Sequence, residues 1–170
     1  MLLTHFVGDI HQPLHVGAIY LDPNGKEVDP EKHHDALMDT RGGNSLFGTG
    51  GNLHHQWDAT KYDLTAEPEN CRGKNANTVK CMADAARKVK ATRGSLNTWP
   101  VQWASDSVVA AKTAYEGITY GAENEQKHSW HMTFENRRAY LKKLHTMQHD
   151  QIVIAGARLS QLLKTIWPEK

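Results

Sequence analysis

The most constraining feature of this sequence is a long apolar stripe near its C-terminal end. Between residues 134 and 166, apolar side chains recur with a helical period, mostly every three or four positions, which places them on one face of an α-helix. The stripe comprises Tyr140, Leu144, Met147, Ile152, Ala155, Leu159, Leu162 and Ile166. A helix of this length has to bury such a stripe against other elements, so the pattern predicts a domain of packed helices.

Other segments also carry helical signals. Residues 2 to 12 hold apolar side chains at helical spacing and end at Pro13, which stops a helix. Further helices are expected from Leu53, over residues 79–93 with a basic amphipathic pattern, and over residues 98–116.

The remaining segments do not alter the helical fold class. Residues 16 to 52 read as a long glycine-rich loop, and no segment predicts a strand. The expected fold class is therefore all-α: one mostly helical domain over residues 1–170, or a part of one.

Composition is informative mainly through histidine. The formal net charge is +1, so charge alone favours neither a nucleic acid nor a membrane as partner. No stretch approaches the ~20 apolar residues of a membrane-spanning helix, and residues 1–15 lack the basic start of a signal peptide. The chain contains 11 histidines, and histidine is the commonest metal ligand.

The two cysteines lie ten positions apart in a polar stretch. Neither Cys71 nor Cys81 belongs to an apolar pattern, which favours a short loop disulfide over two free thiols. Such a disulfide is typical of an exported protein.

The segment HFVGDIHQPLH, residues 5–15, gathers candidate metal ligands. His5 and Asp9 are four positions apart on the expected helix, so they project side by side and can bind one divalent ion. Pro13 then redirects the chain, which brings His15 close to them but aims it elsewhere. His11 and Gln12 are interpreted as bystanders.

A second helix repeats this spacing. His54 and Asp58 are also four positions apart, whereas the neighbouring His55 points about 100° away on a helix. The candidate ligands are therefore His5, Asp9, His15, His54 and Asp58. They offer nitrogen and oxygen donors without a thiolate, which favours a hydrolytic zinc site over a structural cysteine-rich one.

Taken together, these segments resemble a known family. HFVGDIHQPLH, RGGN at residues 41–44 and NLHHQWD at residues 52–58 resemble motifs of the zinc-dependent single-strand-specific nucleases, the S1/P1 family. QWASDS is similar to a further family segment, with Asp106 in place of glutamate, and AGARLSQLL is similar to its last helix. The resemblance covers most of residues 1–167, and residues 20–41 look like a loop insertion.

The resemblance implies a multi-helix fold of the phospholipase C and P1 nuclease type. It also implies three clustered zinc ions that activate water. The expected reactions are endonucleolytic hydrolysis of single-stranded DNA and RNA to 5′-nucleotides and removal of phosphate from 3′-nucleotides. The substrates would thus be single-stranded nucleic acids and 3′-nucleotides, with no membrane partner.

Site roles follow from the same resemblance, residue by residue. His5 would bind one of two close zinc ions, and Asp9 would bridge that pair and act as a catalytic residue. The remaining zinc would be held by His15, His54 and Asp58, the one fully liganded site expected in this chain. Asn44 would lie near the site, as a catalytic residue that supports it or contacts the substrate phosphate.

The chain also departs from the family pattern. The family's N-terminal tryptophan and the His, Asp and His that follow it have no counterpart before His5. We therefore expect the C-terminal portion of a nuclease domain whose N-terminal helices are missing, and a full-length protein that is secreted or periplasmic. Thr60 stands where the family often has asparagine, which puts a phosphate contact there in doubt.

Two alternatives remain open from the sequence. One is a zinc-dependent phospholipase C, which has a related helical three-zinc fold. The other is an inactive zinc-binding remnant, because lost ligands would abolish the zinc pair that activates water.

Overall fold

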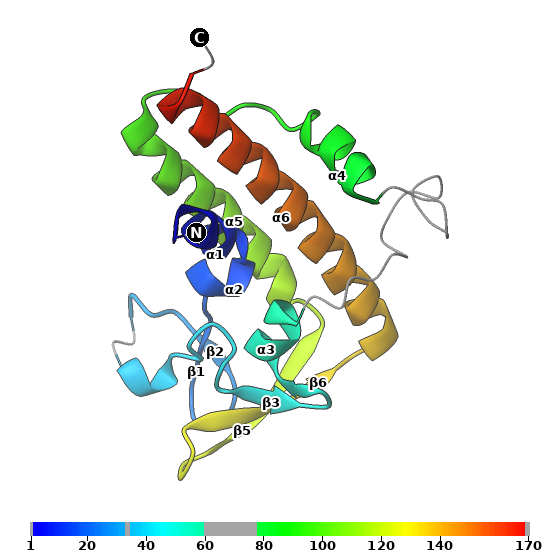
Figure 1. Cartoon of the computed structure of the whole chain (residues 1–170). Helices are drawn as coiled ribbons and strands as arrows, with labels where there is room; N and C mark the ends of the chain where they lie inside the picture. Colours follow the sequence, from blue (N-terminus) through cyan, green and yellow to red (C-terminus); the bar gives the residue numbers. More distant parts are fainter. Residues whose placement is uncertain (1, 33–34, 60–77, 169–170) are drawn as a thin grey trace.

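The computed structural model describes residues 2–32, 35–59 and 78–168, which form a helical layer joined to a small sheet (Figure 1). The helices are α1 Leu2–His11, α2 Pro13–Val16, α3 Leu53–Asp58, α4 Thr78–Ala86, α5 Trp99–Tyr115 and α6 Arg137–Ile166. Short 3-10 turns lie at Ala36–Met38 and Leu96–Thr98. The strands are β1 Tyr20–Leu21, β2 Glu27–Val28, β3 Leu46–Gly48, β4 Gly51–Asn52, β5 Ile118–Asn124 and β6 Ser129–Phe134.

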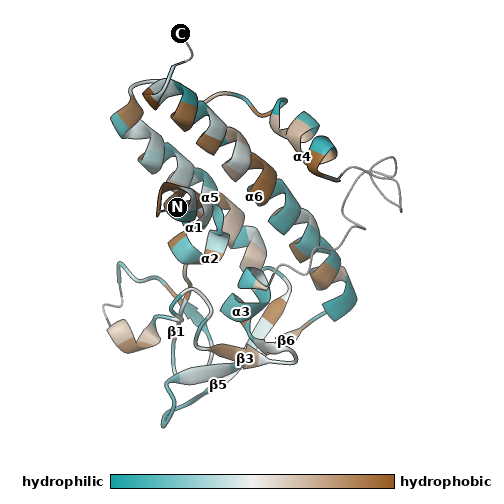
Figure 2. Cartoon of the chain, in the orientation of Figure 1, coloured by the Kyte–Doolittle hydropathy of each residue, from teal (hydrophilic) through white to brown (hydrophobic). Residues whose placement is uncertain are grey.

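The helical layer is organised around α1. This helix contacts both α5 and α6, while α4 packs on α6 (Figure 1). Its Val7 is buried against Trp99 and Trp103 of α5, and Leu159 of α6 packs on the same cluster. Apolar residues recur along α6 and on α1, as expected for helices that share a core (Figure 2). No helix within the described ranges is long and apolar enough to cross a membrane.

A second core lies between the helices and the sheet. It buries Leu46 of β3, Trp57 of α3, Trp130 of β6 and Tyr140 of α6, among other apolar side chains. The Trp57 indole N–H donates to the Tyr140 hydroxyl at 3.0 Å, and that hydroxyl donates to the Ala114 carbonyl at 2.8 Å. One buried hydroxyl therefore joins α3, α5 and α6.

The prediction of a mostly helical fold is confirmed, but the expectation that the chain has no strands is wrong. A four-stranded sheet has the order β4-β3-β6-β5, in which β5 and β6 form an antiparallel hairpin and β3 is parallel to β6. In β6, Trp130 and Met132 are buried while His131 and Thr133 are exposed, the alternation of a half-buried strand. This period of two spans only a few residues, which is too short to distinguish a strand from a loop in the sequence.

The expected loop over residues 16–52 and the expected helix over 79–93 also need correction. The loop contains β1 to β4, and the indole of Trp130 fixes it by donating to the Asp22 carbonyl at 2.9 Å. The helix ends at Ala86 rather than at residue 93. The proposed insertion at residues 20–41 includes β1, β2 and one 3-10 turn, and its status as an insertion stays a prediction.

The Tyr140 hydroxyl gives a direct test of this packing. Tyr140→Phe leaves a buried N–H and a buried carbonyl without their partner, so we expect the free energy of unfolding to fall by about 1–3 kcal/mol. Tyr120→Phe is the matched control, because the buried Tyr120 hydroxyl has no hydrogen-bond partner in the described structure. Urea unfolding should show a neutral or slightly stabilising effect for Tyr120→Phe. Equal effects of the two substitutions would contradict the network.

Candidate metal centre

Three side chains from two distant segments meet at one point. His15 of α2 and His54 and Asp58 of α3 each direct a potential ligand atom into a group whose members lie within 4.8 Å of one another. His15 Nε2 lies 3.3 Å from Asp58 Oδ1, and His54 Nε2 lies 3.5 Å from Asp58 Oδ2. The two imidazole rings stack with their centroids 4.9 Å apart. Two nitrogens and a carboxylate in this arrangement fit a zinc ion.

The α3 helix fixes two members of this group by its own local structure. Asn52 caps the helix by accepting a hydrogen bond from the His55 backbone N–H, and Trp57 is buried in the core. These contacts set the rotation of α3, so the i, i+4 pair His54 and Asp58 faces α2. His55 is exposed and lies outside the group of three.

A close approach of backbone sets the orientation of the His54 ring. His54 Nδ1 lies 2.8 Å from the carbonyl oxygen of Gly42, so Nδ1 carries the proton. Nε2 is then unprotonated and can bind a metal ion. Gly42 has φ +59°, and a Cβ at this position would lie 2.1 Å from the carbonyl oxygen of Leu14. Only glycine fits here, because both the backbone conformation and the available space exclude a side chain.

The two remaining predicted ligands, His5 and Asp9, lie next to this group. His5 Nε2 lies 3.2 Å from Asp9 Oδ2 across one turn of α1, and His15 Nδ1 lies 3.7 Å from Asp9 Oδ1. The His15 ring therefore has a carboxylate on each side, Asp9 and Asp58. His5 is the most open of the five, with 68% of its side chain exposed, compared with 16% for His54.

Asn44 occupies a different position. Its side-chain amide donates to the Arg41 carbonyl at 2.9 Å within the turn that leads into β3. It makes no hydrogen bond with the five candidate ligands, and its predicted catalytic and substrate-binding role stays a prediction. Cys71 and Thr60 lie outside the described residues, so the Cys71–Cys81 disulfide also stays a prediction.

Gln12, interpreted from the sequence as a bystander, forms part of the site. Its side-chain oxygen accepts from the Leu14 backbone N–H and so caps α2, while its side-chain nitrogen donates to Asp58 Oδ1 at 2.9 Å. Gln12 thus links the helix that carries His15 to the carboxylate on α3. Its place directly before Pro13 was the available signal, because that is the N-cap position of a helix beginning at proline.

His11 lies apart from the candidate ligands and has a structural role. It is buried, its Nδ1 donates to the Val7 carbonyl at 2.6 Å, and its Nε2 accepts from Arg158 at 3.0 Å. Burial lowers the pKa of His11, which keeps the ring neutral, as this pair of bonds requires. Arg158 also pairs with Asp106, so α1, α5 and α6 are tied together beside the site.

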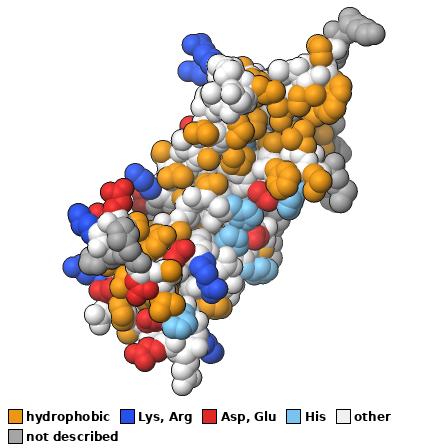
Figure 3. Space-filling model, turned by 90° about the vertical axis from the view of Figure 1, so that its left-hand side faces the viewer, with side chains coloured by type: hydrophobic (Ala, Val, Ile, Leu, Met, Phe, Trp, Pro, Cys, Tyr) orange, Lys and Arg blue, Asp and Glu red, His pale blue; other side chains and the backbone are white. Residues whose placement is uncertain are grey.

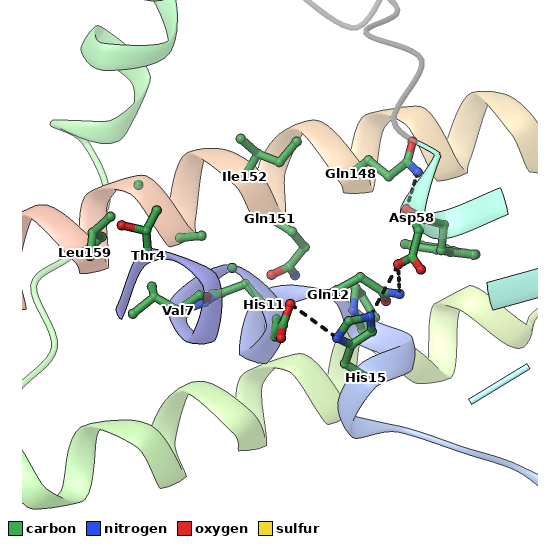
Figure 4. Close-up of a pocket in the computed structure, with 16 residues that line it drawn as sticks. Thr4, Val7, His11, Gln12, His15, Asp58, Gln148, Gln151, Ile152 and Leu159 are labelled. Atoms are coloured by element: carbon green, nitrogen blue, oxygen red, sulfur yellow. Dashed lines mark hydrogen bonds and ion pairs between the residues drawn. The ribbon is translucent and has the colours of Figure 1, made fainter. Parts of the chain in front are cut away.

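A pocket of about 480 Å³ opens from the candidate metal centre and runs between α1 and α6 (Figure 4). His15, Asp58 and Gln12 lie at one end, while Val7, Ile152 and Leu159 give the other end an apolar lining. The arrangement can place a metal ion, with open coordination positions, at the mouth of a mostly apolar pocket. This is the organisation of a catalytic rather than a closed structural metal site.

Comparisons with known proteins agree with these motifs. A family model described as S1/P1 Nuclease matches residues 1–168. Endonuclease 1 of Arabidopsis thaliana is 29% identical over 185 residues, which cover 99% of this chain and 49% of the relative. Endonuclease 4 and Endonuclease 2 of the same plant are each 28% identical, covering 71% and 75% of this chain and 38% and 41% of the relatives. The chain thus spans about half, or less, of the length of these relatives, and no solved structure matches it significantly.

The two hydrogen bonds of Gln12 can be tested separately. Gln12→Ser keeps an oxygen that can cap α2 but loses the reach to Asp58, whereas Gln12→Ala loses both. We expect each variant to bind zinc about 10-fold more weakly, since partners that orient a ligand typically contribute this much. Gln12→Ala alone should also lower thermal stability.

Zinc titration against a chelator measures this effect. Gln151→Ser is the control, because Gln151 lines the same pocket without bonding to a candidate ligand. Unchanged zinc affinity in Gln12→Ser would show that Gln12 only caps the helix.

Proposed function

The chain belongs to the S1/P1 nuclease family, and from this we propose that the protein is a zinc-dependent phosphodiesterase that hydrolyses single-stranded DNA and RNA. The proposal includes 5′-nucleotides as products and a 3′-nucleotidase activity. The observation that carries it is the convergence of His15, His54 and Asp58 at the mouth of a pocket. The names of the Arabidopsis relatives, all endonucleases, are consistent with it.

The donor chemistry of this group supports zinc. His54 offers Nε2 because Gly42 holds its Nδ1, and Asp58 keeps one oxygen toward each histidine while Gln12 orients it. When bound, zinc supplies Lewis acidity that lowers the pKa of a coordinated water and polarises a phosphoryl oxygen. The role of these residues is to present a carboxylate and two neutral imidazoles in a fixed geometry.

His5 and Asp9 are proposed to contribute to a neighbouring metal position. They supply an imidazole and a carboxylate 3.2 Å apart, and Asp9 also faces His15. In this proposal Asp9 stands between the two positions, which is the bridging role implied by the family motif. Asn44 is proposed to support the turn that carries Arg41 and Gly42.

Both proposed reactions break the same kind of bond. In each, water adds to phosphorus, the bond from phosphorus to the 3′-oxygen breaks, and that oxygen leaves as a hydroxyl after taking a proton. A phosphodiester then yields a 5′-phosphate, and a 3′-nucleotide yields inorganic phosphate. One site that recognises the phosphoryl group can therefore serve both substrates. Secretion or a periplasmic location of the full-length protein is part of the same proposal.

Metal binding tests the ligand assignment. We expect the 170-residue chain to bind one zinc ion tightly, because one group of three ligands converges within the described ranges. His54→Ala should lower zinc affinity by more than about 100-fold, beyond the effect of losing an orienting partner. The control is His55→Ala, which removes an exposed neighbour. Equal zinc affinities of the two variants would contradict the assignment.

Substrate choice separates the nuclease from the phospholipase alternative. We expect the zinc-loaded chain to cleave single-stranded DNA slowly, since only one metal position has three ligands among the described residues, and to leave phosphatidylcholine intact. Product analysis should find 5′-phosphates. Preferential hydrolysis of phosphatidylcholine, or fast DNA cleavage with three bound zinc ions, would contradict this prediction.

A further inference from the structure

A second pocket adjoins the candidate metal centre. It is open, has a volume of about 450 Å³, and is lined by His15 and His54 together with Asp39 and Arg41. It shares His15 with the apolar pocket between α1 and α6, so the metal centre lies between an apolar pocket and a polar one. In Figure 3, basic side chains lie just below the histidine group on the same face.

The guanidinium group of Arg41 is anchored through one of its three nitrogens. Its Nε donates to Ser45 Oγ at 3.0 Å, which anchors the guanidinium. Its two terminal nitrogens have no hydrogen-bond or ion-pair partner in the part of the chain that the structure describes. The Asp39 carboxylate, which also lines the pocket, accepts from the Arg41 backbone N–H at 2.7 Å rather than pairing with the guanidinium.

The backbone of Arg41 is in an unusual conformation. Its φ is +51°, and Gly42 and Gly43 follow with φ of +59° and +84°. Glycine adopts this left-handed region more easily than arginine does, and strained residues of this kind concentrate at functional sites. The same turn presents the Gly42 carbonyl to His54, so the position of Arg41 is tied to that of a candidate ligand.

We propose that Arg41 binds a phosphate group of the nucleic-acid substrate beside the metal centre. This inference rests on the proposed function, and it assigns a phosphate subsite to the second pocket. The planar guanidinium presents parallel N–H donors that match two phosphate oxygens, a geometry that lysine cannot reproduce. The anchored Nε leaves the terminal nitrogens as the donors that face the ligand.

The test uses the zinc-loaded chain and a short oligothymidylate with phosphorothioate linkages, which resists cleavage. Arg41→Gln should weaken oligonucleotide binding by about 10-fold or more, as expected for charge-assisted hydrogen bonds. Arg41→Lys keeps the charge and loses the fork, so its affinity should be intermediate. The control, Arg138→Gln, removes an equal charge from an exposed position outside both pockets and should have a small effect.

Two further measurements separate this inference from the proposed function. Zinc affinity should stay within about twofold in Arg41→Gln, because Arg41 is not a ligand. If the parent chain bound no zinc, the proposed function would fail, whereas oligonucleotide binding by the metal-free chain would still reveal dependence on Arg41. Equal binding by Arg41→Gln and Arg138→Gln would overturn the subsite. If Arg41→Gln weakened the binding of inorganic phosphate but not that of the oligonucleotide, the assignment of Arg41 to the nucleic-acid substrate would be overturned.

Discussion

The candidate site depends on the burial of Trp57. Its indole is fixed by the Tyr140 hydroxyl, and its backbone carbonyl accepts from the Gln148 side chain at 2.8 Å, so α3 is held against α6 at two points. This short helix has six residues and could not maintain its orientation alone. With Trp57 held in the core, His54 and Asp58 lie about 60° and 100° from it around the helix axis, both on the side that faces α2. The core packing of one tryptophan therefore determines where two candidate ligands lie.

The parts of the site that the sequence predicts are those governed by local spacing. His5 with Asp9, and His54 with Asp58, are neighbours because four residues make about one helical turn. The redirection of His15 by Pro13 follows from proline chemistry, and the structure shows Pro13 beginning α2. The family assignment also came from these motifs, and it is confirmed by the match over residues 1–168.

What the sequence did not predict depends on contacts between distant segments. The bond from Gln12 to Asp58 joins residues 46 positions apart, and the contact between His11 and Arg158 joins residues 147 apart. No local pattern reports such pairs. The β5–β6 hairpin could not be predicted because the alternation in β6 is short, and in β5 an irregular register between Tyr120 and Glu123 interrupts it.

The position of His15 has a consequence for how the two groups of ligands relate. One imidazole faces Asp58 with Nε2 and Asp9 with Nδ1. If His15 held an ion through Nε2, the ring proton would lie on Nδ1, and that N–H would face the Asp9 carboxylate. Under the proposed function, an ion held by His15, His54 and Asp58 would thus also orient Asp9, and the two proposed positions would load cooperatively rather than as independent sites.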